Sequence, residues 1–377
     1  MTQPFSWHGW LSDQAAQRDE AGLQRELHPR SAADGVLDLA GNDYLGLSQH
    51  PAVVDAAVAA ARTWGAGAGA SRLVTGSLAI HEALEVALAA YTSQPAALVL
   101  STGYHANLSV VSALGGRDSL VVSDAHVHAS LVDAVRLSRS PVEVVPHNAV
   151  AEVVSAVARA AGRRVLVLVE SVYSVLGDQA PLVELASVCA EAGALLVVDE
   201  AHGLGVHGPG LVAALGLAGL EHVVVTATLS KALGSQGGAV LGPKPVVQHL
   251  VNRARPFVYD TGLAPASAGA ALAALQLLRE HPDLPAVVRR RVHDLAAALG
   301  VEPSAGAVLS VPMPSPQVAV AAQAAALQQG VRVGCFRPPS VPDGISRLRI
   351  TTGAGIPEPD WERAVEVLVA VVKEHAG

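Results

Sequence analysis

The 377-residue sequence predicts an α/β protein, with a mostly parallel seven-stranded sheet between helices, an N-terminal arm and a smaller C-terminal α+β domain. Three observations support this prediction. Through the middle of the chain, short apolar segments alternate with helical segments, which is the rhythm of a parallel sheet covered by helices on both faces. This rhythm ends after a long helical segment near residue 264, where prolines become frequent. The chain also exceeds the usual size of a single core.

Three regions follow from these changes in pattern: an arm of residues 1–45, a large α/β domain of residues 46–263 and a small domain of residues 264–377. In the arm, the apolar spacing from Trp10 to Leu27 predicts a helix. A second helix is predicted from Pro51 to Trp64, because proline is favoured in a first turn and the apolar residues that follow share one face.

Seven short apolar segments are the predicted strands of the sheet. They are Ala97–Ser101, Leu120–Ser123, Val142–Pro146, Val165–Glu170, Leu195–Asp199, Val223–Thr226 and Ala239–Leu241. Each gap between them is long enough for a crossover helix, except the last. Because that last connection, Gly234–Gly238, is short, we expect the final strand to return antiparallel.

Further helices are predicted by the same 3.6-residue spacing. One runs from Leu78 to Tyr91, one opens at Pro181 and ends at Gly193, and a long one runs from Ala264 to Glu280. Beyond it, Ala307–Val311 and Leu348–Thr351 are predicted strands of the small domain.

Composition excludes several classes of protein. The longest apolar runs are too short to cross a bilayer, and the N-terminus has no basic region followed by an apolar stretch, so no membrane span or signal peptide is expected. Two cysteines are too few for a disulfide framework and suit a reducing compartment, which predicts the cytoplasm. A net charge of −8 gives no footprint for nucleic acid. The 15 histidines form no compact ligand motif, so no metal site is expected.

Lysine is rare in this sequence, and one lysine stands in an unusual place. The three lysines are Lys231, Lys244 and Lys373. Lys231 follows the apolar run 222–226 and precedes the small-residue stretch 234–238. A lysine so placed can be desolvated, and a desolvated amine is a nucleophile that forms Schiff bases. Taken alone, an ordinary lysine that reaches from a strand end to water is an equally good interpretation.

Residues that follow the first strands are candidates for chemistry, because open parallel sheets bind ligands beyond the carboxyl ends of their strands. Gly103 and Tyr104 lie in a strand-to-helix turn, whose backbone N–H groups and positive helix end suit a phosphate. After the second strand, His126 or His128 can stack on a planar ring. Each feature alone is equally consistent with an ordinary turn or helix cap.

The ends of the later strands add an acid, an imidazole and hydroxyl groups. Asp199 follows four apolar residues, where a carboxylate needs a cationic partner, although capping a helix is the common role of such an aspartate. His202 lies one helical turn further on, and Ser174 and Thr228 supply hydroxyls. With Lys231 for its aldehyde, pyridoxal phosphate is a ligand that uses all of these groups. A metal hydrolase would leave Lys231 without a role.

The segment of residues 65–77 is rich in glycine and resembles a dinucleotide-binding fingerprint only superficially. It follows a predicted helix and lacks the βαβ context of that fingerprint, so we reject this interpretation. The pair Ser71-Arg72 after the glycines favours a ligand or interface loop over a plain flexible loop.

A series of short motifs occurs along the chain. They are Asn42–Ser48 (NDYLGLS), Ser71–Gly76 (SRLVTG), Gly103–Asn107, His128–Leu131 (HASL), Glu170–Asp178, Val198–Gly205 (VDEAHGLG), Thr228–Gly234, Arg337–Pro342 (RPPSVP) and Arg347–Arg349. With these motifs the sequence resembles the α-oxoamine synthases, a branch of the fold-type I pyridoxal-phosphate enzymes, over nearly its whole length. The NDYLGLS, HASL and RPPSVP motifs point to the members that use L-alanine and a pimeloyl thioester.

The resemblance implies three catalytic residues. Lys231 would hold the cofactor as a Schiff base and act as catalytic base. Asp199 would pair with the protonated ring nitrogen, and His128 would stack on the ring. As further cofactor-binding residues, the family pattern implies His202 and Ser174 at the ring hydroxyl.

The same resemblance assigns the phosphate and the substrates. Gly103, Tyr104 and Thr228 would receive the phosphate. Arg349 would bind the amino-acid carboxylate, with Thr351 on the same side of the strand. For the acyl substrate the family uses an N-terminal arginine, for which Arg25 is the candidate, although the local alignment also permits Gln24.

The activity implied by the resemblance is the decarboxylative condensation of L-alanine with pimeloyl-CoA or a pimeloyl-carrier protein. The products would be 8-amino-7-oxononanoate, the free thiol and CO2, and the enzyme would be a homodimer with active sites at the interface. A sister enzyme that joins glycine to another acyl-CoA and a cofactor-free binding or scaffold protein are the alternatives.

Three positions depart from the family pattern. Ala70 precedes Ser71 where relatives usually have glycine, Tyr259–Gly262 replaces a stretch richer in Ser and Thr, and Thr352–Gly355 replaces a segment that often contains Ala-Ala-His. These departures bear on loop geometry and acyl preference, and they leave the cofactor residues intact.

Overall fold

The computed structural model describes residues 5–20, 24–25, 27–32, 35–160, 162–338, 341 and 343–376. It divides into two compact units, Met1–Val36 and Leu37–Gly377. The first unit contains helix α1 (Trp7–Glu20), none of whose side chains is buried. The helix predicted from Trp10 to Leu27 is therefore too long, since residues 24, 25 and 27 are not helical and residue 23 lies outside the described residues. A short helix without a packed face has little to extend it.

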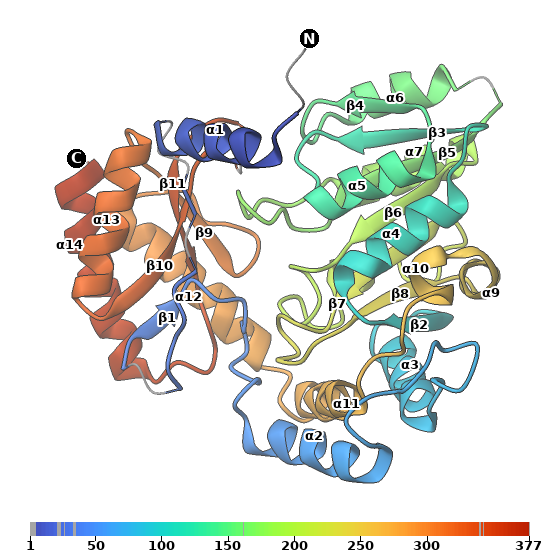
Figure 1. Cartoon of the computed structure of the whole chain (residues 1–377), viewed down its shortest axis with the longest axis horizontal. Helices are drawn as coiled ribbons and strands as arrows, with labels where there is room; N and C mark the ends of the chain where they lie inside the picture. The colour runs from blue at the N-terminus through green and yellow to red at the C-terminus, as the bar shows by residue number, and fades with distance from the viewer. Residues whose placement is uncertain are drawn as a thin grey trace. The chain divides into compact units, whose positions relative to one another are not determined.

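The second unit contains a seven-stranded sheet with the order β2-β8-β7-β6-β5-β3-β4 (Figure 1). The strands are β2 (Ala96–Leu100), β3 (Ser119–Asp124), β4 (Val142–Val145), β5 (Arg164–Glu170), β6 (Leu195–Asp199), β7 (Val223–Thr228) and β8 (Gly238–Gly242). Neighbouring strands are parallel, except where β8 runs antiparallel to β2 and β7. The mostly parallel sheet and the antiparallel return of the last strand are thus confirmed.

Helices that lie between these strands in the chain, or precede and follow them, cover both faces of the sheet (Figure 1). They are α2 (Pro51–Trp64), α3 (Ala79–Tyr91), α4 (Gly103–Leu114), α5 (Ala129–Ser138), α6 (Val150–Ala158), α7 (Leu182–Ala192), α8 (Leu211–Ala214), α9 (Lys244–Arg253), α10 (Arg255–Val258) and α11 (Pro265–Glu280). Alternate strand residues face opposite sides: Leu168 packs into the core under α4 and α5, whereas Val167 and Val169 belong to the core on the other face. The crossover from β6 to β7 contains only the four-residue α8.

A four-stranded sheet of order β1-β10-β11-β9 forms a separate core in the same unit. Its strands are β1 (Leu37–Leu39), β9 (Val308–Pro312), β10 (Val331–Phe336) and β11 (Arg347–Thr351), and its helices are α12 (Leu284–Leu299), α13 (Pro316–Gln328) and α14 (Glu358–Ala376). The two strands predicted in this region are confirmed as β9 and β11, whereas β1 and β10 were not predicted. The domain boundaries themselves stay a prediction. Among the described residues, no helix is both long and apolar enough to cross a bilayer.

Candidate active site

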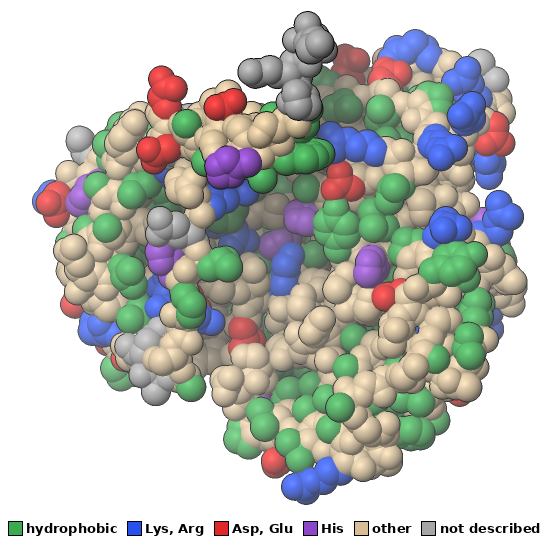
Figure 2. All heavy atoms as spheres, viewed as in Figure 1, with side chains coloured by type: hydrophobic (Ala, Val, Ile, Leu, Met, Phe, Trp, Pro, Cys, Tyr) green, Lys and Arg blue, Asp and Glu red, His purple; other side chains and the backbone are tan. Residues whose placement is uncertain are grey.

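A cavity of about 270 Å³ lies at the carboxyl ends of β5, β6 and β7, the edge where a parallel sheet binds its ligands. Figure 2 shows histidine and basic side chains in a hollow on this face of the molecule. Seven of the predicted site residues line the cavity: Gly103, Tyr104, His128, Asp199, His202, Thr228 and Lys231. Residues predicted from four separate strand ends are thus brought together.

A chain of hydrogen bonds begins at Lys231. Its Nζ lies 2.8 Å from Nε2 of His202, whose Nδ1 lies 2.8 Å from the hydroxyl of Tyr44. The Tyr44 hydroxyl donates to Oδ1 of Asn42 at 3.0 Å. Because the Lys231 amine donates to Nε2 of His202, the proton of the neutral ring lies on Nδ1. This Nδ1–H group donates to the Tyr44 hydroxyl. The Lys231 amine is therefore positioned by a hydrogen bond to the neutral imidazole of His202.

Both cationic groups at the start of this chain are shifted toward their neutral forms. Burial is the main cause that lowers the pKa of Lys231 to about 8, and the charges of Asp199 and Glu170 oppose it. Burial, followed by the charge of Lys231, lowers the pKa of His202 well below its usual value. A fraction of the Lys231 amine is therefore available as a nucleophile or base near neutral pH.

A second network surrounds Asp199. The amide of Asn107 donates through Nδ2 to Oδ2 of Asp199 at 2.7 Å and to the hydroxyl of Ser130 at 2.8 Å. The Thr226 hydroxyl donates to Oδ1 of Asn107 at 2.6 Å and so fixes the orientation of the amide. Ser130 in turn lies 2.7 Å from Nδ1 of His128. The carboxylate and the predicted stacking imidazole are thus held by one set of hydrogen bonds.

The start of α4 forms the other end of the cavity. Thr102 caps this helix through its side chain, and the first N–H groups, from Gly103 onward, have no acceptor within the helix. A Cβ atom on Gly103 would lie 2.8 Å from the Cβ of Thr228, so glycine is required for this close approach. The Thr228 and Ser230 hydroxyls lie 2.5 Å apart. These donors are suited to an anion such as a phosphate.

The residues present fit pyridoxal phosphate. The cavity offers an amine for an aldehyde, a carboxylate for a protonated ring nitrogen, an imidazole beside them and a helix start with hydroxyl groups. It also contains a buried carboxyl oxygen, Oε1 of Glu170, without a hydrogen-bond partner among the described residues. An incompletely paired polar wall of this kind is expected where a polar ligand completes the hydrogen bonds.

Arg349 lies beside the cavity rather than in its lining. It projects from β11, is 5 % exposed, and donates through Nε to the carbonyl oxygen of Ser174 at 2.9 Å. Its Nη2 donates to Oδ1 of Asn42 at 3.2 Å, and its guanidinium lies over the ring of Phe336 at 5.3 Å. Arg349 is therefore joined through Asn42 to the chain of hydrogen bonds that begins at Lys231. Thr351 is buried at the end of β11 and does not line the cavity.

Two predicted segments fall outside what can be placed at the site. Arg25 belongs to the N-terminal unit, and its assignment to the acyl substrate, with Gln24 as the alternative, stays a prediction. In the RPPSVP motif, Pro339, Ser340 and Pro342 lie outside the described residues.

The glycine-rich loop is anchored by its arginine. Arg72 pairs with Glu85 at 2.9 Å and donates through Nε to Ser77 at 3.1 Å. Ser71 forms an isolated bridge with Thr261, from the segment that departs from the family pattern. The ion pair gives Arg72 a structural role in ordering this loop.

A second cluster of titratable groups lies at the ends of β3 and β4, and we call it the His147 cluster. Its members are His147, Asp124, Asp178 and His126. Nδ1 of His147 lies 2.9 Å from Asp124 and Nε2 lies 2.7 Å from Asp178, while the His126 ring stacks on it at 4.0 Å. Although burial opposes it, the two carboxylates raise the pKa of His147 to about 9.

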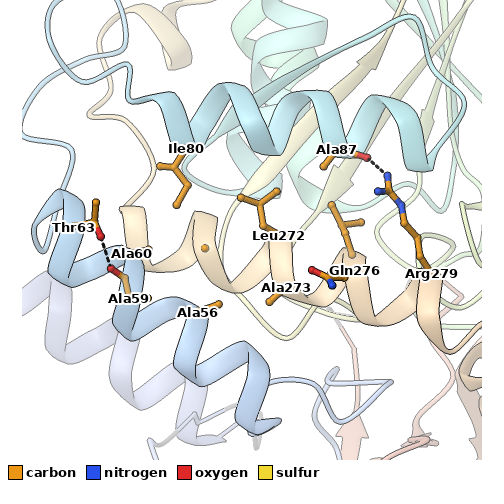
Figure 3. A pocket seen from close by; sticks show the side chains of 12 residues that line it. Ala56, Ala59, Ala60, Thr63, Ile80, Ala87, Leu272, Ala273, Gln276 and Arg279 are labelled. Carbon is orange, nitrogen blue, oxygen red and sulfur yellow. Dashed lines mark hydrogen bonds between the residues drawn. The ribbon is translucent and has the colours of Figure 1, made fainter.

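A larger hollow, about 550 Å³, lies between α2, α3 and α11 (Figure 3). Figure 3 shows Leu272 of α11 on the side of α3, near Ile80, and Ala56 of α2 near Ala273 of α11. Its charged group, Arg279, donates to the carbonyl oxygen of Ala87 at 3.2 Å. Because its lining contains no acid, imidazole or amine, we assign the chemistry to the smaller cavity.

Several residues of the site were not singled out by sequence reasoning. Asn107, Ser130, Tyr44 and Asn42 carry the two hydrogen-bond networks, and Glu170 lines the cavity. Each falls within one of the motifs noted above, so the motif was the available signal. Their hydrogen-bond partners belong to distant segments of the chain, and the sequence does not reveal which segments these are.

Comparison with known proteins agrees with this geometry. Residues 34–368 match the model of the family "Aminotransferase class I and II". The 8-amino-7-oxononanoate synthase of Mycolicibacterium gilvum is 55 % identical over 367 residues, covering 96 % of this chain and 97 % of that protein. The synthase of the same name from Mycobacterium marinum is 54 % identical over 374 residues, covering 98 % and 95 %.

Solved structures give the same fold. The serine palmitoyltransferase of Sphingomonas wittichii matches with a TM-score of 0.88 at 28 % identity, covering 97 % of both chains. A high-resolution structure of SPT with the PLP internal aldimine matches with a TM-score of 0.89 at 27 % identity, covering 98 % of this chain and 99 % of that one. The expected fold-type I architecture is confirmed, and the chain belongs to the class I and II aminotransferase family and, within it, to the 8-amino-7-oxononanoate synthases.

Proposed function

We propose that this chain condenses L-alanine with a pimeloyl thioester, carried by CoA or by a carrier protein, with loss of CO2. The products are 8-amino-7-oxononanoate and the free thiol. One observation carries the proposal: a partly neutralised Lys231 shares a cavity with Asp199 in a chain that is over half identical to 8-amino-7-oxononanoate synthases.

Pyridoxal phosphate supplies an aldehyde that condenses with amines and a ring that withdraws electrons from the substrate Cα. Lys231 would hold the aldehyde, Asp199 the protonated ring nitrogen and His128 the ring face. The N–H groups at Gly103 and Tyr104 would receive the phosphate. These assignments are supported by the shared cavity and by the hydrogen bonds that orient Asp199 and His128.

Three hydroxyl and imidazole groups complete the proposed cofactor site. The Thr228 hydroxyl, which donates to the carbonyl oxygen of Gly237 at 3.1 Å, would turn to the phosphate beside the helix start. His202 would lie at the ring hydroxyl, together with Ser174, whose carbonyl group already accepts from Arg349. The side chain of Ser174 does not line the cavity, so this part of the proposal rests on the family pattern alone.

Proton transfer at the substrate Cα would be carried out by Lys231. With a pKa near 8, its amine is partly neutral at physiological pH and can accept a proton, and its ammonium form can return one. The hydrogen-bond chain through His202 and Tyr44 keeps the amine in one position. A fixed base needs little reorganisation during the reaction.

Binding of the amino acid would fall to Arg349. A guanidinium group has five donors in a planar fork, and the described contacts of Arg349 use Nε and Nη2. The remaining donors suit a carboxylate, with Thr351 on the same strand as a secondary contact. Arg25 is the proposed contact for the acyl substrate.

We further propose a homodimer in the cytoplasm, with active sites at the subunit interface. Support comes from the loop after α2, where Leu73 and Val74 are 51 % and 75 % exposed, an apolar surface that a partner subunit would cover. The free thiols of Cys189 and Cys335 support a reducing compartment.

The test is thiol release with matched substrate pairs. We expect L-alanine to be preferred over glycine by about 10-fold or more, since one methyl group gives about 1–3 kcal/mol of discrimination. Pimeloyl-CoA should be preferred over acetyl-CoA and succinyl-CoA. A preference for glycine with acetyl-CoA would contradict the proposed substrates and favour the sister activity. Product mass then confirms that CO2 has been lost.

A further inference from the structure

Glu170 is a second acid in the cavity, and the proposed chemistry gives it no role. It ends β5 and is paired in register with Asp199, which ends β6. Its side chain is 1 % exposed and lines the same cavity as Asp199 and Lys231. Two carboxyl groups thus lie on adjacent strands around one lysine.

The hydrogen-bond partners of the two acids are unequal. Asp199 accepts from Nδ2 of Asn107 at 2.7 Å and from the N–H of Ala201 at 2.9 Å, so both of its oxygens have donors. Glu170 accepts from the N–H of Ser174 at 3.1 Å through Oε2, whereas Oε1 has no partner among the described residues. Of two like charges in one buried site, the less stabilised one takes the proton.

The electrostatic surroundings of Glu170 agree with its smaller number of hydrogen-bond donors. Burial is the main cause that raises the pKa of Glu170 to about 8, and the charge of Asp199 adds to it. The charge of Lys231 and the hydrogen bond from the Ser174 N–H oppose the shift. A carboxyl group with a pKa raised to about 8 is mainly the neutral acid near neutral pH.

A neutral carboxyl group at this position has one hydrogen that no described residue accepts. Hydrogen bonds from O–H to an anionic oxygen are among the strongest in proteins. The acceptor must come from whatever fills the cavity, because the side chain is closed off from solvent.

We propose that Glu170 is a further functional acid of this site, which donates its free O–H to an anionic oxygen of the bound cofactor and whose ionisation sets the charge state of Lys231. This inference rests on the proposed function for the identity of the ligand. When Glu170 loses its proton at higher pH, a carboxylate forms beside Lys231 and favours the ammonium form of the lysine. The two groups therefore titrate as a pair.

The first measurement uses cofactor-free protein and needs no turnover. The rate at which Lys231 is acylated, followed by mass spectrometry against pH, reports the pKa of its amine. Glu170→Gln removes the nearby charge, so we expect the pKa of Lys231 to fall by about one unit. Glu200→Gln is the matched control: Glu200 is also buried, 2 % exposed, but it is bonded to Ser171 and Val212 outside the cavity. The control should leave the pKa of Lys231 unchanged.

The second measurement separates the donor from the charge. The probe is pyridoxine 5′-phosphate, which lacks the aldehyde and so reports non-covalent contacts. Glu170→Gln keeps an N–H donor and should retain affinity within about 3-fold, whereas Glu170→Met keeps the approximate size, lacks a donor and should lose about 10-fold or more. Circular dichroism checks that each variant is folded.

Two results would overturn the inference. If the Met variant binds the probe as well as the unaltered protein does, Glu170 makes no contact with the ligand. If the Gln variant binds as poorly as the Met variant, or leaves the pKa of Lys231 unchanged, Glu170 does not act as a protonated donor coupled to Lys231. Failure of the unaltered protein to bind the probe would instead contradict the proposed cofactor, and the Lys231 titration would still decide the coupling.

Discussion

The cavity around Lys231 and the His147 cluster are both groups of buried and half-buried titratable side chains at the carboxyl edge of one sheet, yet they are built differently. His147 donates both of its ring hydrogens to carboxylates, at 2.9 and 2.7 Å. Lys231 donates to His202, which burial keeps neutral. In the first cluster both ring nitrogens of the cation are paired with carboxylates, whereas in the second the amine is paired with a neutral imidazole.

The difference appears in the direction of the pKa shifts. Burial is the largest influence on both cations and lowers both pKa values, but the two hydrogen-bonded carboxylates reverse its effect at His147. The pKa of His147 rises to about 9 and that of Lys231 falls to about 8. A buried cation is therefore structural when its acids bond to it directly, and chemically available when they do not.

We expect the largest effect, on cofactor attachment and on turnover, from removal of the Lys231 amine. We expect Lys231→Ala to abolish the borohydride-reducible link to pyridoxal phosphate and to lower turnover at least about 10²–10⁴-fold, the usual contribution of a general base. Absorbance before and after borohydride, with peptide mass mapping, measures the link. Lys244→Ala, at an exposed position in α9, is the control and should keep both link and turnover. A reducible link that survives in the Lys231 variant would contradict the assignment.

The His147 cluster should respond in stability rather than in chemistry. His147→Gln removes a charged donor to two acids, so we expect the free energy of unfolding to fall by about 1.5–3 kcal/mol at pH 6, measured in urea. The pKa in the folded protein, about 9, lies above the unfolded value near 6.5. The stabilisation is therefore complete below about pH 6.5 and is lost as pH rises through about 9.

This pH dependence gives the cluster its own control. The stability difference between His147→Gln and the unaltered protein should shrink between pH 6 and pH 10. His249→Gln, at an exposed histidine of α9, should change stability by less than about 0.5 kcal/mol at each pH. A difference that is constant across this range would mean that His147 is not charged in the folded protein.

The sequence predicts the seven strands well because buried parallel strands are continuous apolar segments bounded by turns. The helix from Pro51 to Trp64 is found with the predicted bounds, because its starting proline and apolar face are local signals. β1 has three residues, too few to show a two-residue period, and its position depends on pairing with β10, nearly 300 residues away. Local sequence patterns thus predict helices and strands better than they predict which strands pair.

The site shows the same division. Lys231 and Asp199 were predicted because each is a charged residue close to the end of an apolar strand, which breaks the local pattern. Asn107 bonds to Asp199 across 92 positions, and in the sequence it is an ordinary polar residue in a helix. His147 and its two acids likewise come from three segments, and no spacing rule unites them. Which groups complete each other's hydrogen bonds is decided by the fold.

The smallest effect is expected at a group of the cavity wall that already has a partner. The hydroxyl of Tyr104 donates to Asp133, so it is not free for a ligand even though the residue lines the cavity. We expect Tyr104→Phe to change the affinity for pyridoxine 5′-phosphate by less than about 2-fold, as for most substitutions that break no buried contact.

Tyr104→Ala supplies the contrast, because it removes the ring as well as the hydroxyl. Loss of an aromatic face should weaken binding of the same probe by about 2–10-fold. Equal losses in the Phe and Ala variants would show that the hydroxyl leaves Asp133 to contact the ligand. In that case, a hydroxyl that already donates to a protein group could still contact the ligand. The distinction between the cavity around Lys231 and the His147 cluster would then rest on their pKa shifts alone.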